Sequence, residues 1–332
     1  MSEETLSESP AGVLLVNLGS PDAPTPAAVR RFLDEFLGDP AVVDRNPLLW
    51  WLVRKLIILP RRGRSSAELY RSVWTPEGSP LIHGTLEQAR LLASRLGAER
   101  RVAVGMRYGT PSLAAGLDEL ADAGCRRVLL LPMFPQYSAT TTGSIETEAR
   151  RWLARRGGDV QLQVVPPYYE DPGYVRALAA VVRSCDRGVE HYVFSFHGLP
   201  VRYVEAGDPY RDHCEATARA LARELGLADD AWDLAYQSRF GPERWLEPDT
   251  AELVPALSRT KSRVLVTCPG FPTDCLETLE EIALRLPKAC AAAGGGELVV
   301  APCLNAHPAW IEALEGLLDN QPAGLASGRS TP

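Results

Sequence analysis

The sequence predicts an α/β protein made of two Rossmann-like halves, each a doubly wound parallel sheet, related by internal duplication. Apolar, β-rich runs alternate with helical patterns along the chain, which is typical of parallel sheets with right-handed crossovers. The runs fall into two sets of four that end in related phrases. The length of 332 residues also exceeds what one hydrophobic core usually holds. We therefore expect two halves that face each other across a cleft.

Eight runs are expected to form the strands, and the patterns between them to form helices. The predicted strands are 12–18, 101–106, 127–133 and 160–165 in the first half, and 191–196, 232–236, 263–268 and 297–302 in the second. Stretches such as TPAAVRRFLDEFL and DHCEATARALARELG have the spacing of helices packed on a sheet.

The duplication is inferred from phrases that follow equivalent strands. MRYGTP in the first half corresponds to SRFGPE in the second, and RVLLLPMFPQYS corresponds to RVLVTCPGFPTD. Arg107 and Arg239 are 132 positions apart, and Arg127 and Arg263 are 136 apart. A nearly constant offset at two landmarks indicates a repeated unit.

These observations divide the chain into five parts. We expect a disordered lead-in, a first half that carries a lip insertion over 40–80, a second half that carries the candidate catalytic residues, a helix that returns to the first half, and a flexible tail. Their expected ranges are 1–11, 12–165, 166–304, 305–320 and 321–332.

The most apolar part of the insertion is NPLLWWLVRKLIILPRRGR, at 46–64. Arg54 and Lys55 interrupt it, and Arg61, Arg62 and Arg64 follow. Its length and basic flank fit a segment that lies on a surface better than one that spans a bilayer. Two interpretations stay open: a helix packed on the edge of the first half, or an apolar lip for a flat apolar ligand or a membrane surface.

Composition excludes several classes of function. A net charge of −7 argues against a nucleic-acid binder. Seven cysteines, an odd number, do not form a secreted disulfide framework. The chain starts without an apolar signal core and has no apolar run of about 20 residues, so we expect a cytoplasmic protein. No G-x-G-x-x-G loop follows a strand, so no nucleotide cofactor is expected.

The phrase VFSFHGLP, at 193–200, places His197 where a buried strand ends. Open parallel sheets bind ligands beyond the carboxyl ends of their strands. A neutral imidazole there can accept a proton near neutral pH or bind a divalent metal. The structural alternative is a histidine that only hydrogen-bonds a nearby carbonyl.

Acidic residues cluster in CPGFPTDCLETLEEIALRL, at 268–286. Asp274 is expected to cap a helix that begins at Cys275, so the structural alternative for Glu277 is the third position of a capping box. Glu277 and Glu281 are four apart and share a helix face, where like charges are slightly destabilising. This arrangement favours a functional explanation, either a divalent cation or a proton path.

The motifs together resemble the ferrochelatase family. They are, in chain order, VNLGSPDAPTPAAVRRFL, ELYRSVWTPEGSPL, GMRYGTP, PQYSATTTGS, FSFHGLP, GDPY, QSRFGPERWLEP and CPGFPTDCLETLEEI. They run from about residue 13 to the helix near residue 315. The resemblance implies the chelatase fold and the insertion of ferrous iron into protoporphyrin IX, with release of two protons, in haem biosynthesis.

The resemblance also implies roles for individual residues. His197 matches the family's essential histidine and Glu277 its essential glutamate, and both are candidate ligands of the iron substrate. We favour His197 as the base, with Glu277 and Glu281 relaying protons or guiding Fe2+. Four further residues match positions that contact or frame the macrocycle, with ordinary packing as the alternative: Tyr70, Arg107, Tyr108 and Trp245. Leu18 matches the position opposite the histidine.

Three alternatives to this function are kept. The chain could use coproporphyrin, could be a chelatase for another metal and tetrapyrrole, or could be a porphyrin or haem carrier without activity. Chelatases for cobalt or nickel usually place two histidines at the metal, whereas only His197 lies at such a strand end here. A carrier would not need the acidic helix.

The expected partners follow from the same reading. They are a porphyrin and, through the lip, a peripheral contact with a membrane, and we expect a monomer that binds no nucleic acid. No iron–sulfur cluster is predicted. The candidate ligands Cys268, Cys275, Cys290 and Cys303 lack a C-x2-C spacing, and a straight helix would separate Cys275 from Cys290 by about 22 Å.

Overall fold

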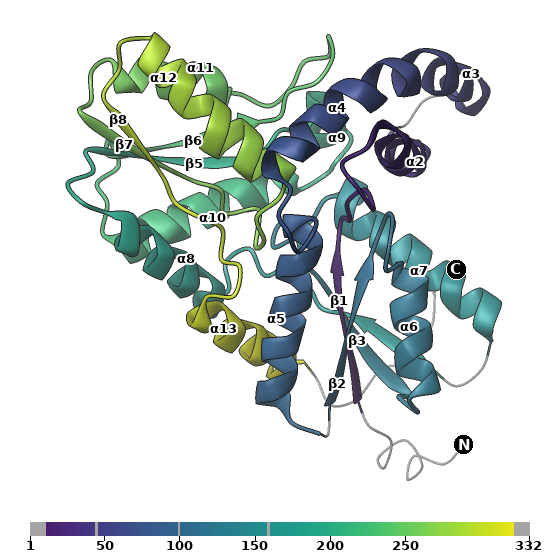
Figure 1. The fold of residues 1–332 in the computed structure, drawn as a ribbon. Coiled ribbons are helices and arrows are strands. Elements are labelled where there is room, and N and C mark those ends of the chain that lie inside the picture. Colours follow the sequence, from purple (N-terminus) through teal and green to yellow (C-terminus); the bar gives the residue numbers. More distant parts are fainter. Residues whose placement is uncertain (1–10, 44–45, 99, 158–159, 322–332) are drawn as a thin grey trace.

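A computed structural model describes residues 11–43, 46–98, 100–157 and 160–321. Two four-stranded parallel sheets dominate it (Figure 1). The first contains β1 (Ala11–Asn17), β2 (Arg100–Met106), β3 (Arg127–Pro132) and β4 (Gln161–Val164), in the order β2-β1-β3-β4. The second contains β5 (His191–His197), β6 (Trp232–Gln237), β7 (Arg263–Thr267) and β8 (Glu297–Val300), in the order β6-β5-β7-β8. The two sheets share one topology, and the predicted α/β class with two parallel sheets is confirmed.

Helices cover the sheets and fill the space between them. The first half contains α2 (Pro26–Phe36), α3 (Pro47–Val53), α4 (Leu59–Val73), α5 (Pro80–Leu96), α6 (Leu113–Asp122) and α7 (Ser144–Arg156), with π-helical segments η1 (Arg54–Ile58) and η2 (Ala139–Gly143). The second half contains α8 (Pro172–Cys185), α9 (Val201–Glu205), α10 (Tyr210–Leu225), α11 (Thr250–Ser258), the π-helical η3 (Glu277–Arg285), α12 (Leu286–Ala292) and α13 (Pro308–Asp319).

Many helix starts follow from their capping residues. The side chains of Thr25, Ser112 and Asp171 accept hydrogen bonds from backbone N–H groups three residues later, at the starts of α2, α6 and α8. Such caps satisfy N–H groups that have no partner inside the helix. Short polar side chains in the sequence therefore account for where these helices begin.

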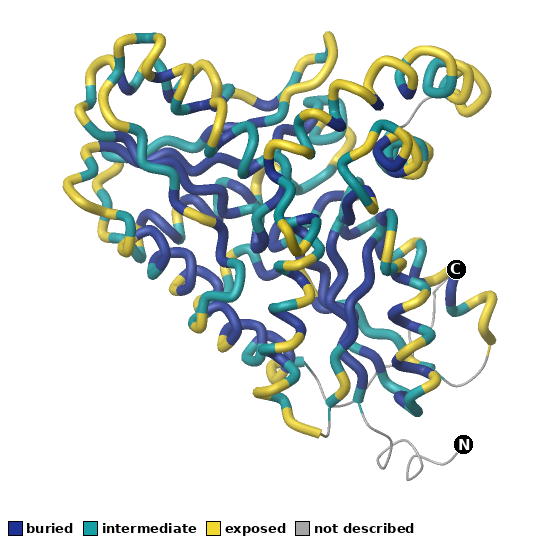
Figure 2. Tube along the Cα trace, in the orientation of Figure 1, coloured by how far each residue is buried: buried dark blue, intermediate teal, exposed yellow. Residues whose placement is uncertain are grey.

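The central core is shared by the two halves. Along β1 the side chains alternate: Val13 and Leu15 enter a core that also contains Phe194 and Phe196 of β5, whereas Leu14 and Val16 enter a separate core under α6 and α7. Helices α5, α8, α10 and α13 contribute to the shared core. Buried residues follow both sheets and the helices between them in Figure 2. The two sheets therefore pack around one continuous hydrophobic core.

The predicted lip forms a long helical segment from α3 through η1 to α4. Buried residues recur on α4 at Leu59, Gly63 and Ala67, and this stripe packs α4 near α2. By contrast, α3 and η1 contain no buried residue, and α3 extends away from both sheets in Figure 1. No helix of the described chain is long and apolar enough to cross a membrane.

The predictions for the two ends of the chain concern residues that lie largely outside the described ranges. The lead-in at 1–11 is described only at Ala11, which begins β1, and the tail at 321–332 only at Gln321. Between them, α13 pairs with the first half: Glu315 binds Arg95 of α5, and Asp319 binds Arg100 of β2.

Candidate active site

His197 is the last residue of β5, at the carboxyl end of the central strand of the second sheet. Its imidazole is half-buried, and Nδ1 lies 2.6 Å from the carbonyl oxygen of Gly198. Because a carbonyl only accepts hydrogen bonds, Nδ1 must carry the proton in the neutral ring. The lone pair is then on Nε2, which can accept a proton or bind a metal.

Trp245 packs against the turn that follows His197. A Cβ atom at Gly198 would lie 3.0 Å from Cε3 of Trp245 and 2.9 Å from the carbonyl oxygen of Gln237. Gly198 therefore permits the close approach of the indole ring and of the neighbouring strand. Trp245 also forms an isolated β-bridge with Pro200. The structure thus places Trp245 next to the turn that follows His197, and its contact with the macrocycle stays a prediction.

The acidic helix does not begin as expected. Asp274 is not an N-cap: its carboxylate accepts hydrogen bonds from the Thr278 hydroxyl at 3.0 Å and from the Asn305 amide at 2.6 Å. The Cys275 N–H instead donates to the Thr278 hydroxyl, and the π-helical segment at Glu277 begins without a side-chain cap. The predicted capping box is therefore wrong, because Asn305, far along the chain, binds the carboxylate that would have capped the helix.

The three carboxylates of this helix have different neighbours. Glu280 forms a salt bridge with Arg285. Glu281 accepts hydrogen bonds from the backbone N–H and the hydroxyl of Ser238, at 2.9 and 2.7 Å. Glu277 lies next to the Cys275 thiol and the Tyr70 phenol. The helix therefore presents Glu277 to groups that belong to the candidate site, while Glu280 is engaged by an arginine.

Tyr70 reaches this site from α4, in the other half of the chain. Burial raises the pKa of Tyr70 well above its ordinary value, and the nearby Glu277 carboxylate raises it further. The phenol consequently stays protonated at neutral pH. The lip insertion thus places one of the predicted site residues near the acidic helix.

Arg107 and Tyr108 lie in a buried network around Asp39. The Asp39 carboxylate accepts hydrogen bonds from the Arg107 guanidinium at 2.5 Å, the Tyr108 hydroxyl at 2.8 Å and the Ser144 hydroxyl at 2.5 Å. Burial alone would raise the pKa of Asp39, but these hydrogen bonds hold it below its ordinary value. Tyr108 is only 1% exposed.

Within the described residues, none of the hydrogen bonds, ion pairs and ring contacts of this network reaches His197 or Glu277. The Tyr108 N–H donates to the carbonyl of Leu18, which follows β1 and is half-buried. Leu18, Arg107 and Tyr108 are therefore grouped at the end of the first sheet.

Gln237, which we did not predict from the sequence, connects the parts of the site. It is the residue paired with His197 across β5 and β6, and it is 1% exposed. Its carbonyl accepts a hydrogen bond from Gly198 at 2.7 Å, and its side-chain amide donates to the carbonyl of Glu277 at 3.4 Å. The available signal was the polar pair QS directly after the strand WDLAY, at the sheet edge where His197 lies.

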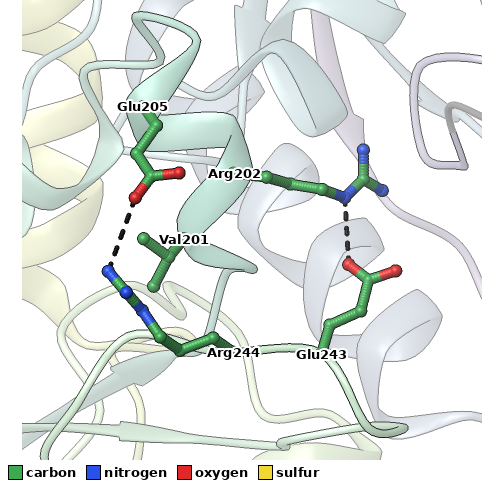
Figure 3. Close-up of a pocket in the computed structure, with 5 residues that line it drawn as sticks. All are labelled: Val201, Arg202, Glu205, Glu243 and Arg244. Atoms are coloured by element: carbon green, nitrogen blue, oxygen red, sulfur yellow. Dashed lines mark hydrogen bonds and ion pairs between the residues drawn. The ribbon is translucent and has the colours of Figure 1, made fainter.

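A cavity of about 280 Å³ lies beside α9 (Figure 3). It is lined by Val201, Arg202, Glu205, Glu243 and Arg244. Arg202 pairs with Glu243 at 2.9 Å and Arg244 with Glu205 at 3.4 Å. These charges neutralise one another, and neither His197 nor Glu277 lines the cavity.

Metal-ligating side chains are dispersed in the described part of the chain. No group of three or more His, Cys, Asp or Glu side chains is arranged there to hold a metal ion. All seven cysteines are free, and burial raises the pKa of Cys268, Cys275 and Cys303. These three side chains are thus kept as thiols. That no iron–sulfur cluster is bound stays a prediction.

Known proteins resemble this chain over most of its length. Residues 10–321 match the family model described as Ferrochelatase. The ferrochelatase of Azoarcus sp. (strain BH72) is 48% identical over 315 residues, or 93% of this chain and 87% of that protein. The ferrochelatase of Chromobacterium violaceum is 44% identical over 327 residues, or 96% and 90%.

Solved structures of other proteins are similar to this chain in fold. The sirohydrochlorin chelatase SirB from Bacillus subtilis subspecies spizizenii, in complex with cobalt, aligns with a TM-score of 0.55 over 93% of this chain and 94% of that chain. At 12% identity, this similarity concerns the arrangement of the two sheets and not the site.

Proposed function

The chain belongs to the ferrochelatase family, and from this membership we propose that it inserts ferrous iron into protoporphyrin IX and releases two protons. The family resemblance seen in the sequence motifs is thereby confirmed. The observation that carries the chemical proposal is the imidazole of His197, which has its proton on Nδ1 and a free lone pair on Nε2 at a strand end.

His197 acts as the base in this proposal. Two pyrrole protons must leave when Fe2+ replaces them, and they lie in the plane of the macrocycle. A neutral imidazole accepts such protons near neutral pH. The hydrogen bond from Nδ1 to the Gly198 carbonyl fixes the ring and directs the lone pair of Nε2 away from the backbone.

Glu277 and Glu281 carry protons away from the macrocycle and guide Fe2+ toward it. Both belong to η3, whose π-helical turns are rare and are frequently found at functional sites. Glu281 is oriented by Ser238, and the carbonyl of Glu277 by Gln237. The carboxylate of Glu281 and the backbone of Glu277 therefore have supports that depend on the end of β6, beside His197.

The remaining predicted residues surround the binding site for the macrocycle. Trp245 and Tyr70 supply aromatic surface next to His197 and Glu277. Arg107 and Tyr108 are engaged by Asp39, so we assign them to the frame of the site and not to direct contact. Gripping the ring edges lets binding energy distort the macrocycle and expose its nitrogens.

The lip contacts a membrane surface peripherally. Leu48 and Leu56 are 73% and 69% exposed, and further large apolar side chains are exposed beside them: Leu49, Trp51, Leu52 and Ile57. Such a patch on one segment is typical of an interaction surface. Arg54 and Lys55 are paired with Asp34, so the exposed Arg61, Arg62 and Arg64 provide the charge that attracts anionic lipids.

A direct assay tests the function. The full chain is mixed without oxygen with Fe2+ and either protoporphyrin IX or coproporphyrin, and haem formation is followed by absorbance. We expect multiple turnovers with protoporphyrin IX, and we expect His197→Ala to lose at least about 100-fold in kcat with an unchanged melting temperature.

Two of the alternatives, use of coproporphyrin and a carrier, have their own outcome in this assay. Faster turnover with coproporphyrin would replace the proposed substrate. A spectral shift of bound porphyrin without turnover would identify a carrier. Near-normal turnover by folded His197→Ala would remove His197 from the role of base.

A further inference from the structure

The first turns of α10 join the loop after β3 to the end of β5. This part of α10 follows the GDPY motif, and the loop contains the PQYSATTTGS motif, so the contact brings together two motifs from different halves of the chain. Tyr210, His213 and Thr217 lie three and four residues apart and share a helix face. All three side chains make hydrogen bonds to other elements.

His213 holds the loop through one nitrogen. The backbone N–H of Tyr137 donates to Nδ1 of His213 at 3.1 Å, so Nδ1 is unprotonated in this arrangement. The ring stacks on Tyr169 with 3.8 Å between centroids and 15° between planes. Burial lowers the pKa of His213, although Asp208, Asp212 and Glu170 act in the opposite direction. The neutral ring is therefore the form that binds the loop.

Asp208 binds the next two residues of the same loop. Its carboxylate accepts hydrogen bonds from the Ser138 hydroxyl at 2.9 Å and the Ala139 N–H at 2.8 Å. The other carboxylate oxygen accepts from the backbone N–H of Tyr210 at 3.0 Å. Asp208 and His213 thus fasten three consecutive loop residues to the start of α10.

Tyr210 extends this connection to the active site. Its hydroxyl donates a hydrogen bond to the backbone carbonyl of His197 at 3.0 Å. The position of that hydroxyl depends on the first turn of α10, which His213 and Asp208 anchor to the loop. The backbone of His197 therefore has a support that begins in the other half of the chain.

We propose that His213 is a positioning residue for catalysis: by accepting the Tyr137 N–H it sets the start of α10, and through Tyr210 it orients His197. This role rests on the proposed function, because it acts through His197 as the base. His213 touches neither the porphyrin nor the iron in this proposal, so its loss changes kcat and leaves the KM for porphyrin nearly unchanged.

A double-mutant cycle between His213→Leu and Tyr210→Phe tests the connection. We expect each single change to lower kcat about tenfold, because small displacements of a catalytic group are costly. The double variant should also lose about tenfold, since both changes interrupt one connection. His213→Asn, which keeps an acceptor near the position of Nδ1, should stay within about twofold of the unaltered chain. His83→Leu, at an exposed position on α5, is the control.

Other results would overturn the positioning role. A loss of about 100-fold in the double variant would mean that the two residues act independently. A His213→Asn variant as impaired as His213→Leu would mean that the acceptor is irrelevant. If His213→Leu does not fold, His213→Gln, whose acceptor is displaced by one methylene, replaces it in the cycle.

The His197→Ala variant, measured in parallel, distinguishes failure of the proposed function from failure of the positioning role of His213. Turnover by that variant would refute the proposed function of His197. An inactive His197→Ala together with an additive cycle would refute only the positioning role of His213.

Discussion

The three carboxylates of η3 differ in their hydrogen-bond and ion-pair partners. Glu280 is bound by Arg285, and Glu281 by the N–H and hydroxyl of Ser238. Glu277 lies beside the Cys275 thiol and near Tyr70. It does not form a capping box with Asp274, because the Asp274 N–H donates to the side chain of Asn305. The capping box is therefore excluded as the structural explanation for this glutamate.

Glu277→Gln should lower kcat by about 100-fold or more while the melting temperature changes by less than about 2 °C. The amide keeps the size of the side chain but cannot carry a proton as a carboxylate does. Turnover and thermal unfolding are measured on the same preparation. Glu280→Gln is the matched control and should retain near-normal kcat. Equal effects of the two changes on kcat would contradict the assignment of Glu277.

Among the elements, the lip combines a packed part and an exposed part in one helical segment. Its α4 part is packed and places Tyr70 near Glu277, whereas its α3 and η1 part contains no buried residue. Trp50 is held by a hydrogen bond from its indole N–H to the carbonyl of Leu37. The exposed apolar side chains of α3 and η1 bury little surface in the fold, and they are Leu48, Leu49, Trp51, Leu52, Leu56 and Ile57.

The double change Trp51→Ser and Leu52→Ser should weaken binding to vesicles with anionic lipids by at least about tenfold, because two large apolar side chains leave the contact surface. Vesicle co-sedimentation measures this, with thermal unfolding as the check on folding. Leu86→Ser, which changes an exposed leucine on α5, should not affect vesicle binding. Unfolding of the double variant would instead show that the segment belongs to the core.

The contact between α10 and the loop after β3 should make stability depend on pH. Burial depresses the pKa of His213 in the folded protein, so the unfolded chain binds the proton more readily, with a pKa near about 6.5. The contribution of His213 to the free energy of unfolding is therefore complete above that pH and is lost as the pH falls below it.

Urea unfolding at a series of pH values between about 8 and 5 measures this dependence. His213→Asn should lose stability less steeply toward acidic pH than the unaltered chain, because the replacement does not titrate. If the two proteins showed the same slope, protonation of His213 would not be coupled to folding.

At the scale of the whole molecule, the shared core makes the two sheets one folding unit. Trp310 of α13 is fully buried in this core and packs against Tyr168 and Tyr174. The same helix forms salt bridges to Arg95 and Arg100 of the first half. A substitution at Trp310 should therefore destabilise both sheets.

Trp310→Ala should cost about 3–5 kcal/mol of the free energy of unfolding, because it removes a large buried ring and leaves a cavity. Trp51→Ala, at an exposed tryptophan, should cost less than about 0.5 kcal/mol. Urea unfolding followed by fluorescence and circular dichroism compares the two. Two separate transitions in the unaltered chain would show that the halves unfold independently.

The amino-acid sequence alone is enough to predict the class of fold, the approximate positions of the strands and the family. Strand runs and caps are local patterns, and the residues that make them are close in the chain, as at β5 and at Thr25. The motif that contains His197 also shows locally that the histidine follows a buried run.

Only the tertiary structure decided which side chains become partners. Asn305 takes the carboxylate of Asp274, so the predicted capping box does not form. Gln237 meets both Gly198 and Glu277 because parallel strands end at one edge of the sheet. Partners of this kind are separated by tens of residues in the chain, and no local pattern specifies their distance. The physical reason is that hydrogen-bond partners are chosen by proximity in the folded molecule, which the packing of both sheets around a shared core sets.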